Sequence, residues 1–314
     1  MKFLQKITLF ILATLISTNI TYAEDGQKNE TDIIIAGGNP FGLRYAQSGK
    51  VCGYVNKTDA DGNCVVYPTD SSADSISALL EGKVNFAMVQ SDWLQHAIDG
   101  TSRYSEYGEN DNFRLLAVLG AEQVVVVVNK NAGINSLSDL KNKSIDIGAQ
   151  NTYRNIVSLG LLDVAGLDEG DLKLSFNGTE QEAIDSVCKG KADGAVFILS
   201  QPNLILDTMS AQCNVTFVNL ADNEIAEFGK NYKGFYKSVI PAETYWSQDG
   251  EVNTIGLYTT LITTTDTKKE MVQSVKDGLV NNIEDFEQSH PMLRGVNAEN
   301  INRNIGVKFY NTTE

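Results

Sequence analysis

A glycine-rich stretch, AGGNPFGLRYAQSG from Ala36 to Gly49, stands where a short apolar run gives way to residues with helix-forming character. A strand-to-helix turn of this kind can hold an anion on the N–H groups of the helix N-terminus. The phosphate-binding loop and the dinucleotide fingerprint are both excluded, because Leu43 follows Gly42 and GGNPFG has the wrong spacing. The stretch therefore predicts either an anion-binding turn that uses Gly42, Arg44 and Tyr45 or an ordinary strand-to-helix connection.

A second polar loop, GAQNTYR, ends at Arg154 and precedes an apolar-periodic segment. A guanidinium at a helix start can clamp a carboxylate together with backbone N–H groups. Asn151, Thr152 and Arg154 are therefore candidate ligand contacts. A surface arginine is the alternative for Arg154.

Residues for catalysis are sparse. The nucleophile motif G-x-S-x-G does not occur, and the only histidines, His96 and His290, lie far apart in the sequence. A Ser-His-Asp triad is therefore not expected. Paired carboxylates in so acidic a chain are more typical of a solvated surface. We expect a binding protein that is not an enzyme and that needs no cofactor and no metal.

The wider pattern alternates strand-like and helix-like segments, which indicates an α/β fold with mostly parallel sheets. Apolar runs predict strands, and capped periodic segments predict helices, among them a long one over 268–290. We expect Ser91 to cap the helix over 91–100. The expected strands include 84–90, 115–120, 123–130, 144–148 and 254–265.

Parallel sheets bind ligands beyond the carboxyl ends of their strands, so the polar loops after the strands are the places to look. These loops are 38–45, 69–75, 90–93, 148–154 and 199–203. They add five candidate side chains, and for Trp93 a packed core position is the alternative. The five are Ser72, Gln90, Trp93, Pro202 and Asn203.

The N-terminus resembles an export signal. Two lysines precede an apolar stretch too short to span a bilayer, and Thr21–Tyr22–Ala23 ends in a small residue suited to cleavage. We expect a signal peptide over 1–23 and a periplasmic protein, with an uncleaved anchor as the alternative. The net charge of −15 argues against nucleic-acid binding, which requires a basic surface.

The four cysteines are consistent with an oxidising compartment. Three pairings are possible, and we favour Cys52–Cys64 with Cys188–Cys213 because each would close a short local loop. Zinc is the competing interpretation. It is disfavoured because no Cys-x-x-Cys occurs and the histidines are dispersed.

With these loops in view, the mature chain resembles the TAXI family, the solute-binding proteins of tripartite ATP-independent periplasmic (TRAP) transporters. The segment YPTDSSADSISALLEGKVNFAMVQSDW, residues 67–93, is the most specific match. IIAGGNPFGLRY matches a glycine-rich turn that a tyrosine pair follows in the family, although Arg44 replaces the first tyrosine here. The QPN turn also matches, and a cysteine pair in relatives supports Cys52–Cys64.

The resemblance implies a type II periplasmic-binding-protein fold, with two α/β lobes and a ligand cleft between them. Lobe one would comprise 24–120 and 236–314, and lobe two would comprise 121–235. Glu122 matches an acidic position that could receive an ammonium group. The implied protein is a monomeric receptor for a glutamate-like amino acid or a dicarboxylate such as 2-oxoglutarate, which it delivers to TRAP permease subunits. The alternative is a secreted or surface interaction protein that uses the same fold without transport.

Overall fold

The computed structural model describes residues 32–58 and 63–311. The signal peptide expected over 1–23 lies outside these ranges. Within them, no helix has the length and apolar character needed to cross a membrane.

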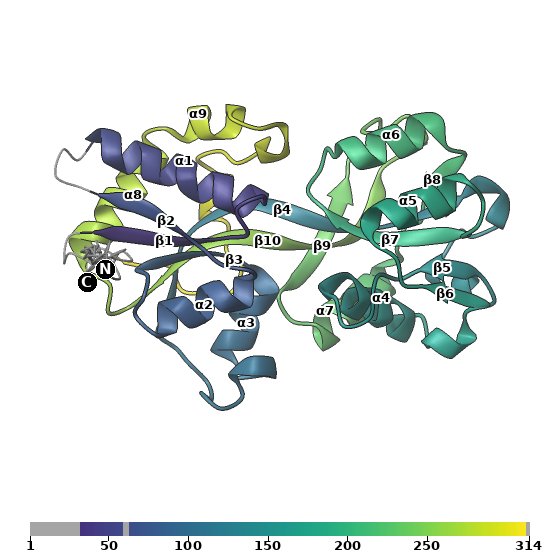
Figure 1. The fold of residues 1–314 in the computed structure, drawn as a ribbon, viewed down its shortest axis with the longest axis horizontal. Coiled ribbons are helices and arrows are strands. Elements are labelled where there is room, and N and C mark those ends of the chain that lie inside the picture. Colours follow the sequence, from purple (N-terminus) through teal and green to yellow (C-terminus); the bar gives the residue numbers. More distant parts are fainter. Residues whose placement is uncertain (1–31, 59–62, 312–314) are drawn as a thin grey trace, which may run out of the picture. The chain divides into compact units, whose positions relative to one another are not determined.

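The strands build one ten-stranded mixed sheet in the described part of the chain (Figure 1). Its main path runs β2-β1-β3-β10-β4-β7-β5-β6, while β8 pairs with β4 and β9 pairs with β10. The strands are β1 (Ile33–Gly38), β2 (Cys64–Pro68), β3 (Phe86–Gln90), β4 (Phe113–Asn129), β5 (Ser144–Asp146), β6 (Leu174–Phe176), β7 (Gly194–Leu199), β8 (Val215–Phe217), β9 (Phe235–Ile240) and β10 (Val252–Thr264).

Helices follow most of the strands, as the alternating sequence pattern predicts. The α-helices are α1 (Leu43–Thr58), α2 (Ser72–Leu80), α3 (Ser91–Ile98), α4 (Tyr153–Val164), α5 (Glu180–Cys188), α6 (Leu204–Gln212), α7 (Asp222–Asn231), α8 (Lys269–Val280) and α9 (Ile283–Gln288). Short 3₁₀ turns are η1 (Ser102–Tyr104), η2 (Lys130–Ala132), η3 (Leu137–Leu140), η4 (Glu169–Asp171), η5 (Pro291–Leu293) and η6 (Asn300–Asn302).

Two long strands connect the two halves of the sheet. The first part of β4 pairs with β10, and its later part pairs with β7 and β8. β10 likewise pairs with β9 at its start and with β3 towards its end. Parallel pairs on either side, β1 with β2 and β3, and β5 with β6 and β7, complete the halves.

Four apolar clusters cover the two faces of each half. In the first half, α1, α8 and α9 bury one face and α2 and α3 bury the other (Figure 1). In the second half, α4 and α7 bury one face and α5 and α6 bury the other. Each half is therefore an α/β sandwich with its own core, as the type II fold requires.

The cores also indicate where the chain returns to the first half. Ile240, Tyr245 and Val252 pack with the second half, and Leu261 is in the core of the first. We therefore propose that the boundary lies within β10, and not at residue 235 as the sequence suggests.

Three local expectations were wrong. The segments 115–120 and 123–130 form one continuous strand, β4, because it spans both halves of the sheet. The expected helix over 268–290 breaks into α8 and α9 at Asn281 and Asn282. Ser91 does not cap α3: Gln90 occupies that position, and the Ser91 hydroxyl bonds elsewhere.

Both favoured disulfides are confirmed. Cys52 pairs with Cys64 and Cys188 pairs with Cys213, with Cα–Cα distances of 4.9 and 5.1 Å. Cys52 and Cys64 are buried in the first core and tie α1 to β2. The second bridge ties the end of α5 to the end of α6.

Candidate functional site

The glycine-rich turn serves the packing of α1 against the sheet. A Cβ at Gly37 would come within 2.6 Å of Val66 Cγ1, and Gly38 has a positive φ of +79°. The N–H groups of Phe41 and Gly42 donate to the Asn39 side chain and carbonyl, respectively. The turn therefore has the contacts of a strand-to-helix connection, with Arg44 and Tyr45 on the first turn of α1, and its expected contact with an anion stays a prediction.

Four of the candidate residues form one hydrogen-bonded cluster at the carboxyl ends of the strands. Arg44 Nη1 lies 2.8 Å from Glu122 Oε1, and Gln90 Nε2 donates to Glu122 Oε2 over 2.9 Å. Ser72 Oγ donates to Gln90 Oε1 at 3.3 Å and accepts from the Gln90 N–H at 3.1 Å. Arg44 Nε is buried without a partner in the described structure, so the cluster retains one unused donor.

This polar cluster takes its four members from four different elements. Arg44 comes from α1, Ser72 from the start of α2, Gln90 from the end of β3, and Glu122 from the middle of β4. Glu122 stands where β4 passes from one half to the other, so the cluster lies at the junction of the halves.

Asp92 and Tyr153 close the junction. Tyr153 Oη donates to Asp92 Oδ2 over 2.7 Å, which links α3 of the first half to α4 of the second. Burial raises the pKa of Asp92 to about 6, against the lowering effect of the Tyr153 hydroxyl, and the charge of Glu122 raises it further. Burial and the Asp92 carboxylate raise the pKa of Tyr153 well above its usual value. Asp92 Oδ1 has no partner among the described groups.

Two further contacts hold the same side of the junction together. Ser91 Oγ donates to the Gly234 carbonyl over 2.7 Å, and Lys233 Nζ lies 2.7 Å from Asp99 Oδ2. Gly234 has a positive φ of +86°, and a Cβ there would come within 2.4 Å of Asp92 Cα. Glycine is therefore required for this close approach.

Arg154 lies in the second half, where its guanidinium already has three acceptors. Nη2 donates to Asp146 Oδ1 at 2.8 Å and to the Gly178 carbonyl at 2.6 Å, while Nη1 donates to the Val196 carbonyl at 3.0 Å. Asp146 is 1% exposed. This geometry favours a structural arginine that joins the end of β5, the loop after β6 and the middle of β7, and its expected contact with a ligand stays a prediction.

The remaining candidates are placed apart from the cluster. Thr152 Oγ1 caps α4 by accepting from the Asn155 N–H, and Asn203 Oδ1 accepts from the Ile205 N–H at the start of α6. Three others lie in or next to the loops that predicted them. Asn151 is exposed and has a φ of +62°, and the peptide bond between Gln201 and Pro202 is cis. Trp93 is partly buried and its ring packs beside His96.

Asp92 and Tyr153 are the residues that sequence reasoning missed. Both stood inside the quoted segments, in QSDW and NTYR. Their pairing depends on how the two halves meet, which no spacing in the sequence encodes. Both also line a pocket of about 360 Å³ beside α3, α4 and α7.

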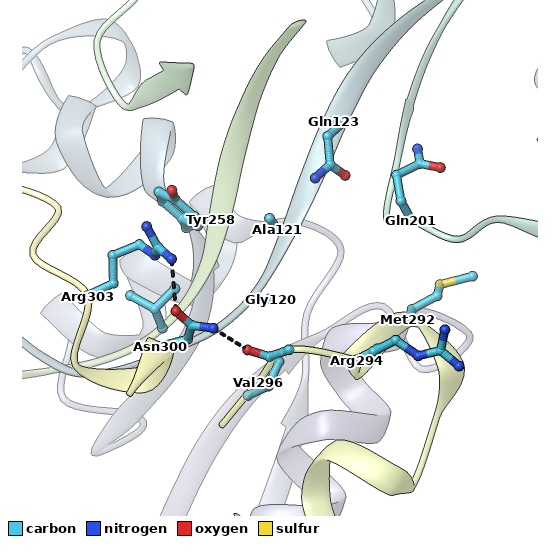
Figure 2. Close-up of a pocket in the computed structure, with 12 residues that line it drawn as sticks. Gly120, Ala121, Gln123, Gln201, Tyr258, Met292, Arg294, Val296, Asn300 and Arg303 are labelled. Atoms are coloured by element: carbon cyan, nitrogen blue, oxygen red, sulfur yellow. Dashed lines mark hydrogen bonds between the residues drawn. The ribbon is translucent and has the colours of Figure 1, made fainter. Parts of the chain in front are cut away.

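A second hollow lies on the other side of β4. Figure 2 shows it bounded by Gln123 of β4, Gln201 from the loop after β7, Tyr258 of β10, and the C-terminal residues Arg294 and Arg303. Its volume is about 230 Å³, and a neighbouring hollow shares Gln123, Gln201 and Arg294.

Two α/β halves connected by long crossing strands, with a polar cluster at their junction, define the two-lobe fold of periplasmic binding proteins. Solved structures agree. A TctC solute-binding protein from Polaromonas superposes with a TM-score of 0.53 at 14% identity, over 84% of this chain and 86% of that one. PhnD1 from Prochlorococcus marinus, in complex with methylphosphonate, gives 0.51 at 16% identity, over 84% and 90%.

The family model described as NMT1-like matches residues 35–310. The chain therefore belongs to the NMT1-like family.

Proposed function

We propose that this chain is a solute-binding receptor whose ligand is a small carboxylate held at the Arg44–Glu122 pair. The observation that carries the proposal is the cluster of Arg44, Gln90 and Glu122 at the strand ends where the lobes meet. Ligands of open α/β sheets bind in this position. The two-lobe fold shared with the TctC protein and PhnD1 supports the proposal.

The charges of the pair suit an amino acid. A ligand carboxylate could take the place of Glu122 on the forked donors of Arg44, and an ammonium group could then neutralise Glu122. The unpartnered Arg44 Nε is a further donor for that carboxylate. A glutamate-like amino acid uses both charges of the pair, whereas a dicarboxylate such as 2-oxoglutarate would leave Glu122 uncompensated.

Entry to the cluster requires the lobes to separate. The contact between Tyr153 and Asp92 spans the junction beside the cluster, and it is a single hydrogen bond that opening would break. Hinged closure around a solute is a common motion of two-lobe binding proteins. The long strands β4 and β10 would serve as the hinge.

We further propose that the protein is exported, acts as a monomer, catalyses no reaction, and passes its solute to TRAP permease subunits. The two disulfides support export because such bonds persist in oxidising compartments. The resemblance to TAXI proteins supports the TRAP assignment.

A thermal-shift screen tests the proposal. A panel of amino acids, dicarboxylates and neutral amides is added to the purified chain, and a ligand that binds only the folded state must raise the melting temperature. We expect stabilisation by at least one carboxylate and no turnover of it by mass spectrometry. Stabilisation by none of the panel would favour an interaction protein, and turnover that a cluster substitution abolishes would indicate an enzyme.

A further inference from the structure

The hollow beside the C-terminal segment carries an unusual charge pattern. Three of the six arginines of the chain pair with carboxylates, namely Arg44, Arg103 and Arg154. Arg114 donates to two backbone carbonyls. The other two, Arg294 and Arg303, have no carboxylate within ion-pair distance among the described residues, and both line this hollow.

The two arginines lie at opposite ends of the segment 294–303, and the Arg294 guanidinium points away from Arg303 (Figure 2). Arg303 Nη2 donates to Asn300 Oδ1 over 2.9 Å, and its guanidinium lies 5.5 Å from the centre of the Tyr258 ring. Asn300 Nδ2 donates in turn to the Gly295 carbonyl over 2.8 Å, next to Arg294. The contacts position Arg303 and leave most of its donors available.

The remaining walls combine amides with apolar groups. Gln123 donates to Ser238 Oγ over 3.2 Å, and its buried Oε1 has no partner in the described structure. Val118, Val296 and Tyr258 provide an apolar surface. One carboxylate, the exposed Glu243, lines only the neighbouring hollow. Two unpaired cations beside an apolar wall, in a chain of net charge −15, are suited to an anion with a carbon body.

This hollow is distinct from the Arg44–Glu122 cluster. Glu122 and Gln123 are adjacent in β4, and successive side chains of a strand point to opposite faces. Glu122 turns to Arg44 and Gln90, whereas Gln123 turns to the hollow. The residues that line the hollow include none of the residues of the cluster.

We propose that Arg294 and Arg303 form a second binding site, which takes an organic anion such as a short dicarboxylate. Arg303 would hold one carboxylate of the anion, whose carbon body would lie on Tyr258 and Val296, while Arg294 adds positive charge at the far side of the hollow. Guanidinium groups match carboxylate oxygens in forked geometry, which favours a carboxylate over a spherical anion. A second anion site beside the hinge strand would let solution composition influence the receptor independently of its solute.

Calorimetric titration with succinate, and with neutral succinamide as the matched ligand, tests the proposal. The proteins are the wild-type chain, the double variant Arg294→Gln/Arg303→Gln, Arg44→Gln for the cluster, and Arg114→Gln as a control that removes a positive charge away from the hollow. Arg294 and Arg303 are exposed, so the double variant should fold, as circular dichroism would verify. We expect saturable succinate binding that weakens at least about tenfold in the double variant and persists in Arg44→Gln and Arg114→Gln.

Three results would overturn the second site. Succinate binding that survives in the double variant but disappears in Arg44→Gln would place the anion in the cluster instead. Absence of saturable binding of succinate to the wild type up to about 10 mM would mean that no specific anion site exists in the hollow. Equal binding of succinamide would also contradict a site built on charge.

Discussion

Tyr153 and Asp92 meet across the junction of the two lobes, with the phenol donating to Asp92 Oδ2 over 2.7 Å. Asp92 is 4% exposed and its Oδ1 has no partner among the described groups. A buried carboxylate with one donor is poorly compensated. The contact therefore holds the lobes together while leaving Asp92 sensitive to pH.

Replacing Tyr153 by Phe should destabilise the folded chain more at pH 8 than at pH 5. The variant removes the donor to Asp92 Oδ2, which costs roughly 1–3 kcal/mol for a buried acceptor and is most severe when the carboxylate is charged. Urea unfolding at both pH values measures the difference. An equal loss at pH 5 and pH 8 would show that the charge of Asp92 does not set the strength of this contact.

Replacing Asp92 by Asn should stabilise the chain above pH 6. Burial raises the pKa of Asp92 from its ordinary value to about 6, so between these two values the folded state holds a proton that the unfolded state has released. The contribution of Asp92 to the free energy of unfolding is fully present below about pH 4, and it is lost as the pH rises through about 6. The gain of the variant at pH 8 should reach at most roughly 3 kcal/mol.

Asp99, the residue that directly follows α3, provides the matched control. Burial opposes ionisation of Asp99, but Lys233 and Gln95 outweigh it and hold its pKa below the usual value. Its contribution therefore has the opposite sign, and Asp99→Asn should not stabilise the chain at pH 8. Stabilisation by Asp99→Asn, or none by Asp92→Asn, would contradict this account of the junction.

Replacing Arg154 by Ala should lower stability more than solute affinity. Asp146 is buried beside it, and removing one partner of a buried ion pair costs roughly 3–5 kcal/mol. Arg154→Lys should restore part of the stability because an ammonium cannot reach all three acceptors. Chemical unfolding and solute titration on the same variants separate the two effects. A loss of affinity with unchanged stability would restore Arg154 as a ligand contact.

Removing the disulfides should have unequal effects. Cys188→Ser/Cys213→Ser opens a bridge that spans 25 residues and should cost roughly 3 kcal/mol through the freedom regained by the unfolded chain. Cys52→Ser/Cys64→Ser should cost more, because it also places hydroxyl groups at two buried positions. Thermal unfolding of both pairs would measure this, and a smaller loss for the buried pair would contradict it.

The sequence predicted features that depend on local chemistry. The spacing of Thr179 and Glu182 is that of a capping box, which begins α5, and both local disulfides formed. The α/β alternation followed from apolar runs separated by capped helices. The sequence also predicted the members of the polar cluster, because three of them lie at strand ends or helix starts. The cluster comprises Arg44, Ser72, Gln90 and Glu122.

Features that depend on long-range packing could not be predicted in the same way. Ser91 reads as a helix cap, but its hydroxyl bonds Gly234, which is 143 residues away. The sequence predicts Arg154 as a ligand contact at a helix start, but Asp146 and two carbonyls surround it once β5, β6 and β7 are aligned. The sequence did not predict the contact between Asp92 and Tyr153, because this contact forms only where the two lobes meet.

Calorimetric titration of wild type, Arg44→Gln and Glu122→Gln with L-glutamate and 2-oxoglutarate tests the central claim most directly. If the pair receives an amino acid, wild type binds glutamate and either substitution weakens that binding by about tenfold or more. Glu122→Gln should not weaken 2-oxoglutarate, which has no ammonium group to place there. If either ligand binds with the same affinity to wild type and Arg44→Gln, the carboxylate site is not at this pair.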